Sequence, residues 1–199
     1  TLPLLALALP HVGHFQTRNR GTLGGSVAHA DPSAEIPLVL ATLGGTVELA
    51  SGRGTRRIGA REFFVDALTT ARQSDELLTG LCWPRRRAGA GHAFGETCQR
   101  RGDFAIVAIA AVAVVEAGGR LAYLALGLGG VEGRPALADT GAFLGRSADD
   151  RLAREIAAAA ADAADPMSDS KASADYRRAL VRSVGAAVLA AAFADSGRH

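Results

Sequence analysis

Two apolar runs separated by a glycine turn constrain the fold more than any other part of this 199-residue chain. Residues 108–116 and 120–129 are mostly apolar, and they flank Ala117-Gly118-Gly119. Glycines between two such runs supply the tight reversal that joins neighbouring antiparallel strands. The sequence therefore predicts a β-hairpin in the second half of the chain. Three glycines end the second run, where they either form a bulge or bring the backbone close to another part of the protein: Gly127, Gly129 and Gly130.

Short alternating segments elsewhere predict further strands, and longer apolar patterns predict helices. The predicted strands are residues 46–50 with a partner that ends at Ile58, then 76–83 and 91–98. The predicted helices are residues 3–8, 34–43, 139–144, 149–164 and 174–193. Antiparallel strands with helices packed on them make an α+β fold.

The last predicted helix carries both a start signal and a candidate packing face. Ser173 precedes it and is a preferred capping residue. One stripe of the helix is expected to pack on the sheet, and it consists of Tyr176, Leu180, Val184 and Val188. A basic, glycine-containing stretch without periodicity, residues 84–91, is the predicted linker between two halves of the chain.

The composition excludes several classes of function. The chain is 48% hydrophobic with a net charge of +2, so it can bury a core but offers no charge excess for nucleic acid. No apolar run is long enough to span a membrane, which leaves at most peripheral membrane contact. Cys82 and Cys98 lie far apart outside any Cys-x-x-Cys pattern, so we expect buried cytosolic thiols and no metal site. His11 and His14 lack a third ligand and are expected to be surface or hydrogen-bonding side chains.

A glycine-rich stretch at residues 18–31 is the strongest candidate for a ligand site. Its glycines permit a positive φ and a close approach of the backbone to a ligand. Thr22 and Ser26 add hydroxyl groups, while Arg18 and Arg20 add planar cationic donors suited to phosphate. The pattern is neither the Rossmann fingerprint nor a P-loop. It predicts a glycine turn that cradles the pyrophosphate of a nucleotide cofactor, or else a plain loop.

The stretch RNRGTLGGSVAHADPSAEIP, residues 18–37, resembles the second FAD-binding segment of the medium (flavoprotein) subunit of molybdenum hydroxylases. That family includes aerobic carbon monoxide dehydrogenase and the xanthine dehydrogenases. The turn RRGDFA at residues 100–105 resembles a turn of the family's C-terminal domain. The resemblance implies that residues 1–87 are a partial FAD-binding domain, an antiparallel sheet with helices of the PCMH-like kind. Residues 88–199 then form a CO dehydrogenase flavoprotein C-terminal-like domain, a small antiparallel sheet plus helices.

The resemblance also implies that the chain binds FAD and carries no catalytic acid, base or nucleophile of its own. Thr22, Gly24, Gly25 and Ser26 would grip the pyrophosphate. Phe104 would lie near the isoalloxazine ring. The cofactor-binding residues that this reading predicts are Arg20, Gly21, Thr22, Leu23, Gly24, Gly25, Ser26, Asp31, Glu35 and Phe104.

Three of these residues have alternative interpretations. Asp31 either caps the helix at 34–43 or reaches the cofactor ribose. Glu35 is the other candidate for the ribose and stands where the family usually has Asp. Phe104 stands where the family often has tyrosine, and it either borders the flavin or packs in the core between the two halves. Asp103 beside it is expected to cap a following helical turn.

The resemblance implies an electron-transfer subunit that works with two partners in the cytoplasm. A large subunit would hold the molybdenum cofactor, and a small subunit would hold 2Fe–2S clusters. The family's first glycine-rich flavin motif, of the Ala-Gly-Gly-His-Ser kind, is not found in these 199 residues. We therefore expect half of a cofactor site. Either a lobe that precedes it or a separate piece completes the site, or the chain is incomplete and binds FAD weakly. Two alternatives are a stand-alone flavin oxidase of the vanillyl-alcohol-oxidase type, with His29 as a covalent flavin ligand, and a flavin-free assembly module.

Overall fold

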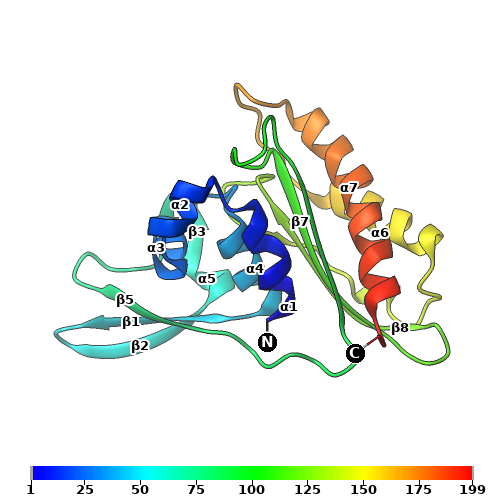
Figure 1. Cartoon of the computed structure of the whole chain (residues 1–199), viewed down its shortest axis with the longest axis horizontal. Coiled ribbons are helices and arrows are strands. Elements are labelled where there is room, and N and C mark those ends of the chain that lie inside the picture. The colour runs from blue at the N-terminus through cyan, green and yellow to red at the C-terminus, as the bar shows by residue number, and fades with distance from the viewer. Residues whose placement is uncertain (1, 199) are drawn as a thin grey trace.

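The computed structural model describes residues 2–198 and has an α+β fold, as predicted (Figure 1). The helices are α1 (Pro3–Ala8), η1 (Leu9–His11), α2 (Phe15–Arg20), α3 (Leu23–His29), α4 (Glu35–Leu43), α5 (Ala60–Phe63), η2 (Gly141–Phe143), α6 (Asp150–Ala163) and α7 (Ala174–Asp195). The strands are β1 (Thr46–Ser51), β2 (Gly54–Gly59), β3 (Phe64–Asp66), β4 (Thr69–Thr70), β5 (Leu77–Cys82), β6 (Gly91–Thr97), β7 (Val107–Val115), β8 (Leu121–Gly129) and β9 (Ala136–Leu137). No helix among the described residues is long and apolar enough to cross a membrane.

The predicted hairpin is confirmed as the centre of a four-stranded antiparallel sheet with the order β6-β7-β8-β9. Strand β7 is apolar throughout because both of its faces are covered. Side chains alternate between the faces of a strand, so Ile109 and Ala111 join the core under α6 and α7. Ala110 and Val112 join the core formed with the N-terminal half. One strand therefore contributes to two hydrophobic cores.

Helices cover both faces of this sheet (Figure 1). Helices α6 and α7 lie on one face, while α1 and α4 lie on the other. The glycines of β8 make room for α4, because a Cβ on Gly127 would clash with the hydroxyl of Thr42, and one on Gly129 would lie 3.0 Å from Leu38. Of the two interpretations of these glycines, close approach of backbone is the one that the structure bears out.

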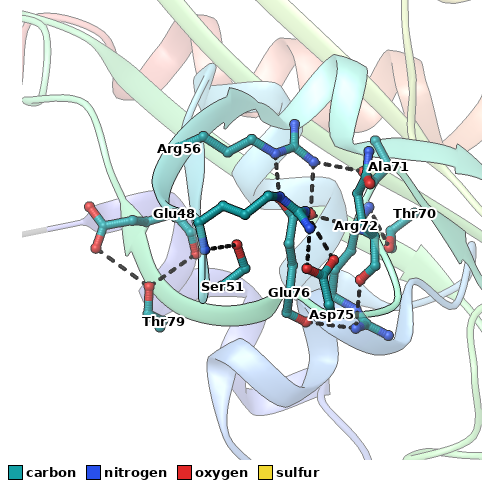
Figure 2. A network of polar contacts seen from close by, with 11 residues as sticks. Glu48, Ser51, Arg56, Thr70, Ala71, Arg72, Asp75, Glu76 and Thr79 are labelled. Atoms are coloured by element: carbon teal, nitrogen blue, oxygen red, sulfur yellow. Dashed lines mark hydrogen bonds and ion pairs between the residues drawn. The ribbon is translucent and has the colours of Figure 1, made fainter.

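The N-terminal half contains a second antiparallel sheet with the order β2-β1-β5, and its β1–β2 hairpin matches the prediction. A polar network closes one end of this sheet (Figure 2). Arg56 donates to both carboxylate oxygens of Glu76 at 2.6 and 2.9 Å, and to the carbonyl of Ala71. These bonds from Arg56, with one from the Gln73 N–H, lower the pKa of Glu76 to about 2. The loop before β5 is thereby held against β2.

One prediction about the helices is confirmed, and two are corrected. The Ser173 cap is confirmed, since its Oγ accepts the N–H of Tyr176 at 3.2 Å. The stripe was placed partly wrong, because Tyr176 is 48% exposed while Arg177 and Val181 are buried. Successive residues of a helix point about 100° apart around its axis. A stripe that starts at Tyr176 rather than at Arg177 therefore begins on the solvent side of the helix. The helical turn expected after Asp103 is absent, and the next element is β7.

The cysteines also differ from their prediction. Cys82 and Cys98 are free thiols, but both are half-buried rather than buried. Burial, together with the nearby carboxylates, raises the pKa of the Cys98 thiol, so this thiol is a poor nucleophile.

Candidate functional site

A cavity of about 650 Å³ lies between the N-terminal helices and the loop that joins β6 to β7. Its size is in the range of cofactor sites. Most of its wall comes from residues 9–36, and the C-terminal half contributes residues 102–104. The lining residues are Leu9, Val12, Gly13, Thr17, Arg18, Gly21, Thr22, Leu23, Gly25, Ser26, His29, Asp31, Ala34, Glu35, Ile36, Gly102, Asp103 and Phe104.

The glycine-rich stretch is helical, which corrects the prediction of a glycine turn. Thr22 is the cap of α3, and its Oγ1 accepts the N–H of Gly25 at 2.9 Å. A Cβ on Gly25 would lie 2.9 Å from that oxygen, so glycine lets the cap close. The first N–H groups of the helix, at Leu23 and Gly24, have no partner inside it. The Thr22 cap thus satisfies one of the first N–H groups of this seven-residue helix.

Eight of the ten predicted cofactor-binding residues line this cavity, and they are Gly21, Thr22, Leu23, Gly25, Ser26, Asp31, Glu35 and Phe104. The other two do not line it. Gly24 faces β5, since a Cβ there would lie 3.3 Å from Leu78. Arg20 is the last residue of α2 and is exposed. Two stretches far apart in the sequence, residues 9–36 and 102–104, thus converge on one site.

Arg18 lines the cavity, but its guanidinium is engaged with the protein itself. Its Nη1 donates to the carbonyls of Val12 at 2.9 Å and Gly13 at 2.6 Å. Those bonds fix the turn between η1 and α2, where Gly13 has a φ of +49°. Arg18 therefore shapes the wall of the cavity, a role that the sequence did not indicate.

Asp31 does not cap α4, because the helix begins four residues later at Glu35 and its cap position is Ala34. The Asp31 Oδ1 instead accepts the N–H of Ser33 at 2.8 Å, and so stabilises the turn that enters the helix. The preceding residue, Ala30, ends α3 in the left-handed conformation with a φ of +55°. Its carbonyl accepts the N–H of Leu68 at 3.0 Å, which holds this strained residue in place.

Glu35 is a buried carboxyl group in the cavity wall, with only 4% of its surface exposed. Burial raises its pKa to about 7, and the negative charges of Glu96 and Asp31 add to the rise. Glu96 is also buried, and burial raises its pKa although its Oε1 lies 3.1 Å from His11 Nδ1. Its Oε2 has no hydrogen-bond partner among the described residues. Glu35 in the cavity wall and the neighbouring Glu96, which does not line the cavity, are thus two carboxyl groups whose pKa values are raised by burial.

Phe104 is 48% exposed and lines the cavity, so it is not packed in the core between the halves. Its loop is closed at the neck by the bond from the Ile106 N–H to the Thr97 carbonyl, at 2.7 Å. The Lys171 ammonium lies 5.8 Å from the centre of the Phe104 ring. A flat apolar surface is therefore presented to the cavity next to a cation.

Sequence reasoning missed the apolar and small residues that the turn between η1 and α2 contributes. Val12 and Gly13 belong to no ligand motif, and the one signal that could have found them is the helix break at Gly13 just before the basic stretch. His29, in the last turn of α3, also lines the cavity. Among residues 2–198 no group of three or more His, Cys, Asp or Glu side chains could hold a metal ion.

Comparison with known proteins identifies the family. Residues 1–86 match the model of the FAD binding domain in molybdopterin dehydrogenase, and residues 92–192 match that of the CO dehydrogenase flavoprotein C-terminal domain. The chain is 30% identical to the carbon monoxide dehydrogenase medium chain of Hydrogenophaga pseudoflava, over 97% of its own length and 68% of that protein's. It belongs to the FAD-binding medium-subunit family of molybdenum hydroxylases. The resemblance inferred from residues 18–37 and 100–105 is thereby confirmed.

Other members of the medium-subunit family agree with this assignment. The nicotine 6-hydroxylase medium subunit of Paenarthrobacter nicotinovorans is 39% identical over 91% of this chain, which spans 64% of that relative's length. Among solved structures, carbon monoxide dehydrogenase from Hydrogenophaga pseudoflava matches with a TM-score of 0.92 at 29% identity, covering 98% of this chain and 68% of that one. Quinoline 2-oxidoreductase from Pseudomonas putida 86 matches with a TM-score of 0.91 at 36% identity, covering 96% and 67%.

Proposed function

We propose that this chain is the FAD-binding, electron-transfer part of a molybdenum hydroxylase, and that FAD binds in the 650 Å³ cavity. One observation carries the proposal. The chain matches an FAD-binding domain, and eight of the ten residues predicted to bind the cofactor line this one cavity. Its volume suits part of a dinucleotide, with the remainder of FAD held outside this cavity.

The donor set of the cavity fits the polar end of this cofactor. The hydroxyl groups of Thr22 and Ser26 line the cavity and are suited to donate hydrogen bonds to the pyrophosphate. Asp31 and Glu35 are the candidates for the ribose. Because burial raises the pKa of Glu35 to about 7, the protonated form is well populated at neutral pH. In that form the carboxyl group can donate a hydrogen bond and adds no negative charge beside the phosphates. Phe104 supplies an apolar wall for the ring system.

When bound, FAD supplies the redox chemistry, accepting electrons from iron–sulfur centres and passing them to an external acceptor. The residues of this chain bind it, orient it and exclude water from it. None of them is assigned as a general acid, general base or nucleophile. The partners in the proposal are a large subunit with the molybdenum cofactor and a small subunit with 2Fe–2S clusters, in the cytoplasm. Support comes from relatives that are named medium subunits and medium chains.

A stand-alone flavin oxidase is the second candidate, favoured by one observation: His29 lines the cavity, where it could bond covalently to a flavin. The two candidate functions differ in how the flavin is attached, which is non-covalently in the first and through a covalent bond to His29 in the second. Flavin released by denaturation supports the first, whereas flavin that stays on the wild-type chain but not on His29→Ala supports the second.

The test is the visible absorption spectrum of the chain, alone and co-expressed with large and small subunits, followed by titration with FAD. A carboxylate at Ser26 would face the pyrophosphate, so Ser26→Asp should abolish flavin retention. The matched control is Ser183→Asp on the exposed side of α7. Gly24 is unsuitable for this test, because a side chain there would meet Leu78 rather than the cavity. Full retention in Ser26→Asp would refute the assignment, and a protein colourless in every combination would point to a flavin-free assembly module.

A further inference from the structure

Arg177 is a buried arginine that the proposed function does not use. It lies in the first turn of α7 and is 2% exposed. Its guanidinium donates to three carbonyls, those of Ile106, Gly130 (2.6 Å) and Met167 (3.1 Å). Its Nη2 also donates to the Asp169 carboxylate at 2.7 Å. Arginine is suited to this position because its planar group offers five donors in a fixed geometry.

Two of these bonds lead to the walls of the cavity. Ile106 closes the neck of the loop that carries Phe104. Gly130 donates its own N–H to the carbonyl of Pro32 at 2.7 Å, next to Asp31 in the opposite wall. The Arg177 guanidinium thus bonds directly to Ile106, at the neck of the Phe104 loop. It is connected to the wall from the N-terminal half through Gly130.

Gly130 fits this junction for two reasons. Its φ is +70°, which favours glycine. A Cβ there would lie 2.7 Å from the Ile106 carbonyl and 3.0 Å from that of Ala105. The backbone after β8 therefore packs directly against the neck of the Phe104 loop, and Arg177 bonds to both segments where they meet.

The Asp169 bond extends the network to the exposed face of Phe104. The Asp169 Oδ1 accepts the N–H groups of Lys171 and Ala172, both at 2.9 Å, while its Oδ2 accepts from Arg177. This arrangement shapes the loop before α7 and places the Lys171 ammonium 5.8 Å from the Phe104 ring centre. The cation beside the ring depends on the same buried guanidinium.

We propose that Arg177 is a positioning residue of the cofactor site, which holds the Phe104 loop at a fixed place relative to the Asp31 wall. The proposal rests on the proposed function, since a fixed aromatic wall matters because FAD binds there. Arg177 reaches no lining position itself and acts through Ile106, Gly130 and Asp169. Its loss would leave buried carbonyls without donors, and the Phe104 loop would sample several positions.

The test uses Arg177→Met and, as a matched control, Val181→Ala, which removes buried volume one turn further along α7. In the complex with its partner subunits, Arg177→Met should raise the FAD dissociation constant at least about tenfold and weaken the visible circular dichroism of the flavin. Arg177→Lys, which keeps the charge but not the fork of donors, should recover part of this loss. Val181→Ala should lower the melting temperature but change FAD affinity less than about twofold.

A second measurement needs no FAD. Amide hydrogen exchange across residues 98–105 should accelerate at least about tenfold in Arg177→Met, with no change in β1 and β2. Should Arg177→Met not fold, Asp169→Ala decides the matter by both measurements, because it removes the partner of the guanidinium at a half-exposed position. Unchanged exchange in the loop, or an equal loss of affinity in Val181→Ala, would overturn the proposal. A wild-type complex without FAD would refute the proposed function, while the exchange measurement would still decide the role of Arg177.

Discussion

Replacing Glu35 with glutamine should stabilise the folded chain at alkaline pH and leave its stability nearly unchanged at acid pH. The carboxyl group lies in the first turn of α4, where the helix dipole favours a negative charge. Burial outweighs that effect and raises its pKa from 4.5 to about 7, with Glu96 and Asp31 contributing further repulsion. Glutamine has nearly the same shape and never ionises, so it reproduces the protonated state at every pH.

The sign follows from proton binding. The folded chain holds the Glu35 proton more tightly than the unfolded chain, so this carboxyl group lowers the free energy of unfolding as the pH rises from 4.5 through about 7. A tenfold change in proton affinity corresponds to 1.36 kcal/mol, which makes the total loss about 3 kcal/mol. Glu35→Gln should avoid that loss. The difference between variant and wild type should grow from near zero at about pH 3.5, below the unfolded pKa, to at most about 3 kcal/mol at about pH 8.5.

The assay is urea unfolding of both proteins at a series of pH values, followed by circular dichroism. Glu116→Gln, at the exposed turn after β7, is the matched control. Its free energy of unfolding should change with pH in the same way as that of the wild type. The buried Glu96 also has a raised pKa and contributes a slope of the same sign, so the informative quantity is the difference between Glu35→Gln and wild type. If that difference is the same at acid and alkaline pH, Glu35 ionises in the folded chain without cost, and the reasoning from burial is refuted.

Three further substitutions test packing and backbone geometry by thermal or urea unfolding. Ala30→Gly should stabilise the chain by up to about 1 kcal/mol, because glycine adopts the left-handed φ of +55° without strain; destabilisation would contradict this. Ser173→Ala should cost about 1 kcal/mol, because it removes the cap bond to Tyr176, whereas Ser183→Ala should cost less. Gly127→Val should cost at least about 3 kcal/mol or prevent folding, because its side chain would occupy the place of Thr42, and a tolerated valine would show that α4 does not pack there.

Local signals were enough to predict much of the secondary structure. The turn at Ala117-Gly118-Gly119 and the apolar runs beside it specify the β7–β8 hairpin without help from the rest of the chain. Ser173 and Asp149 each precede a helix and accept its N–H groups, at 3.2 and 2.8 Å. Such contacts join residues close in sequence, so their pattern is visible in the sequence itself.

Tertiary packing decided the parts that the sequence did not predict. Glycines favour turns on propensity, yet the stretch that begins at Leu23 is helical. Its Thr22 cap is a local contact, whereas the close approach of Gly24 to Leu78 is a tertiary contact that the neighbouring sequence does not show. The position of Phe104 in the cavity depends on a loop whose partners lie in α7 and after β8. A single arginine in a helix usually indicates a solvated side chain, so nothing near Arg177 in the sequence reveals its burial.

The shared central strand has a consequence for how the protein can be divided. The two family models meet near residues 87–91, which invites expression of each part alone. Residues 92–198 alone would uncover the face of β7 that carries Ala108, Ala110 and Val112, now sealed by α4. Such an apolar sheet surface is prone to aggregation. The boundary between the two family models therefore does not divide this chain into parts that are stable alone, and its halves are expected to melt in one transition.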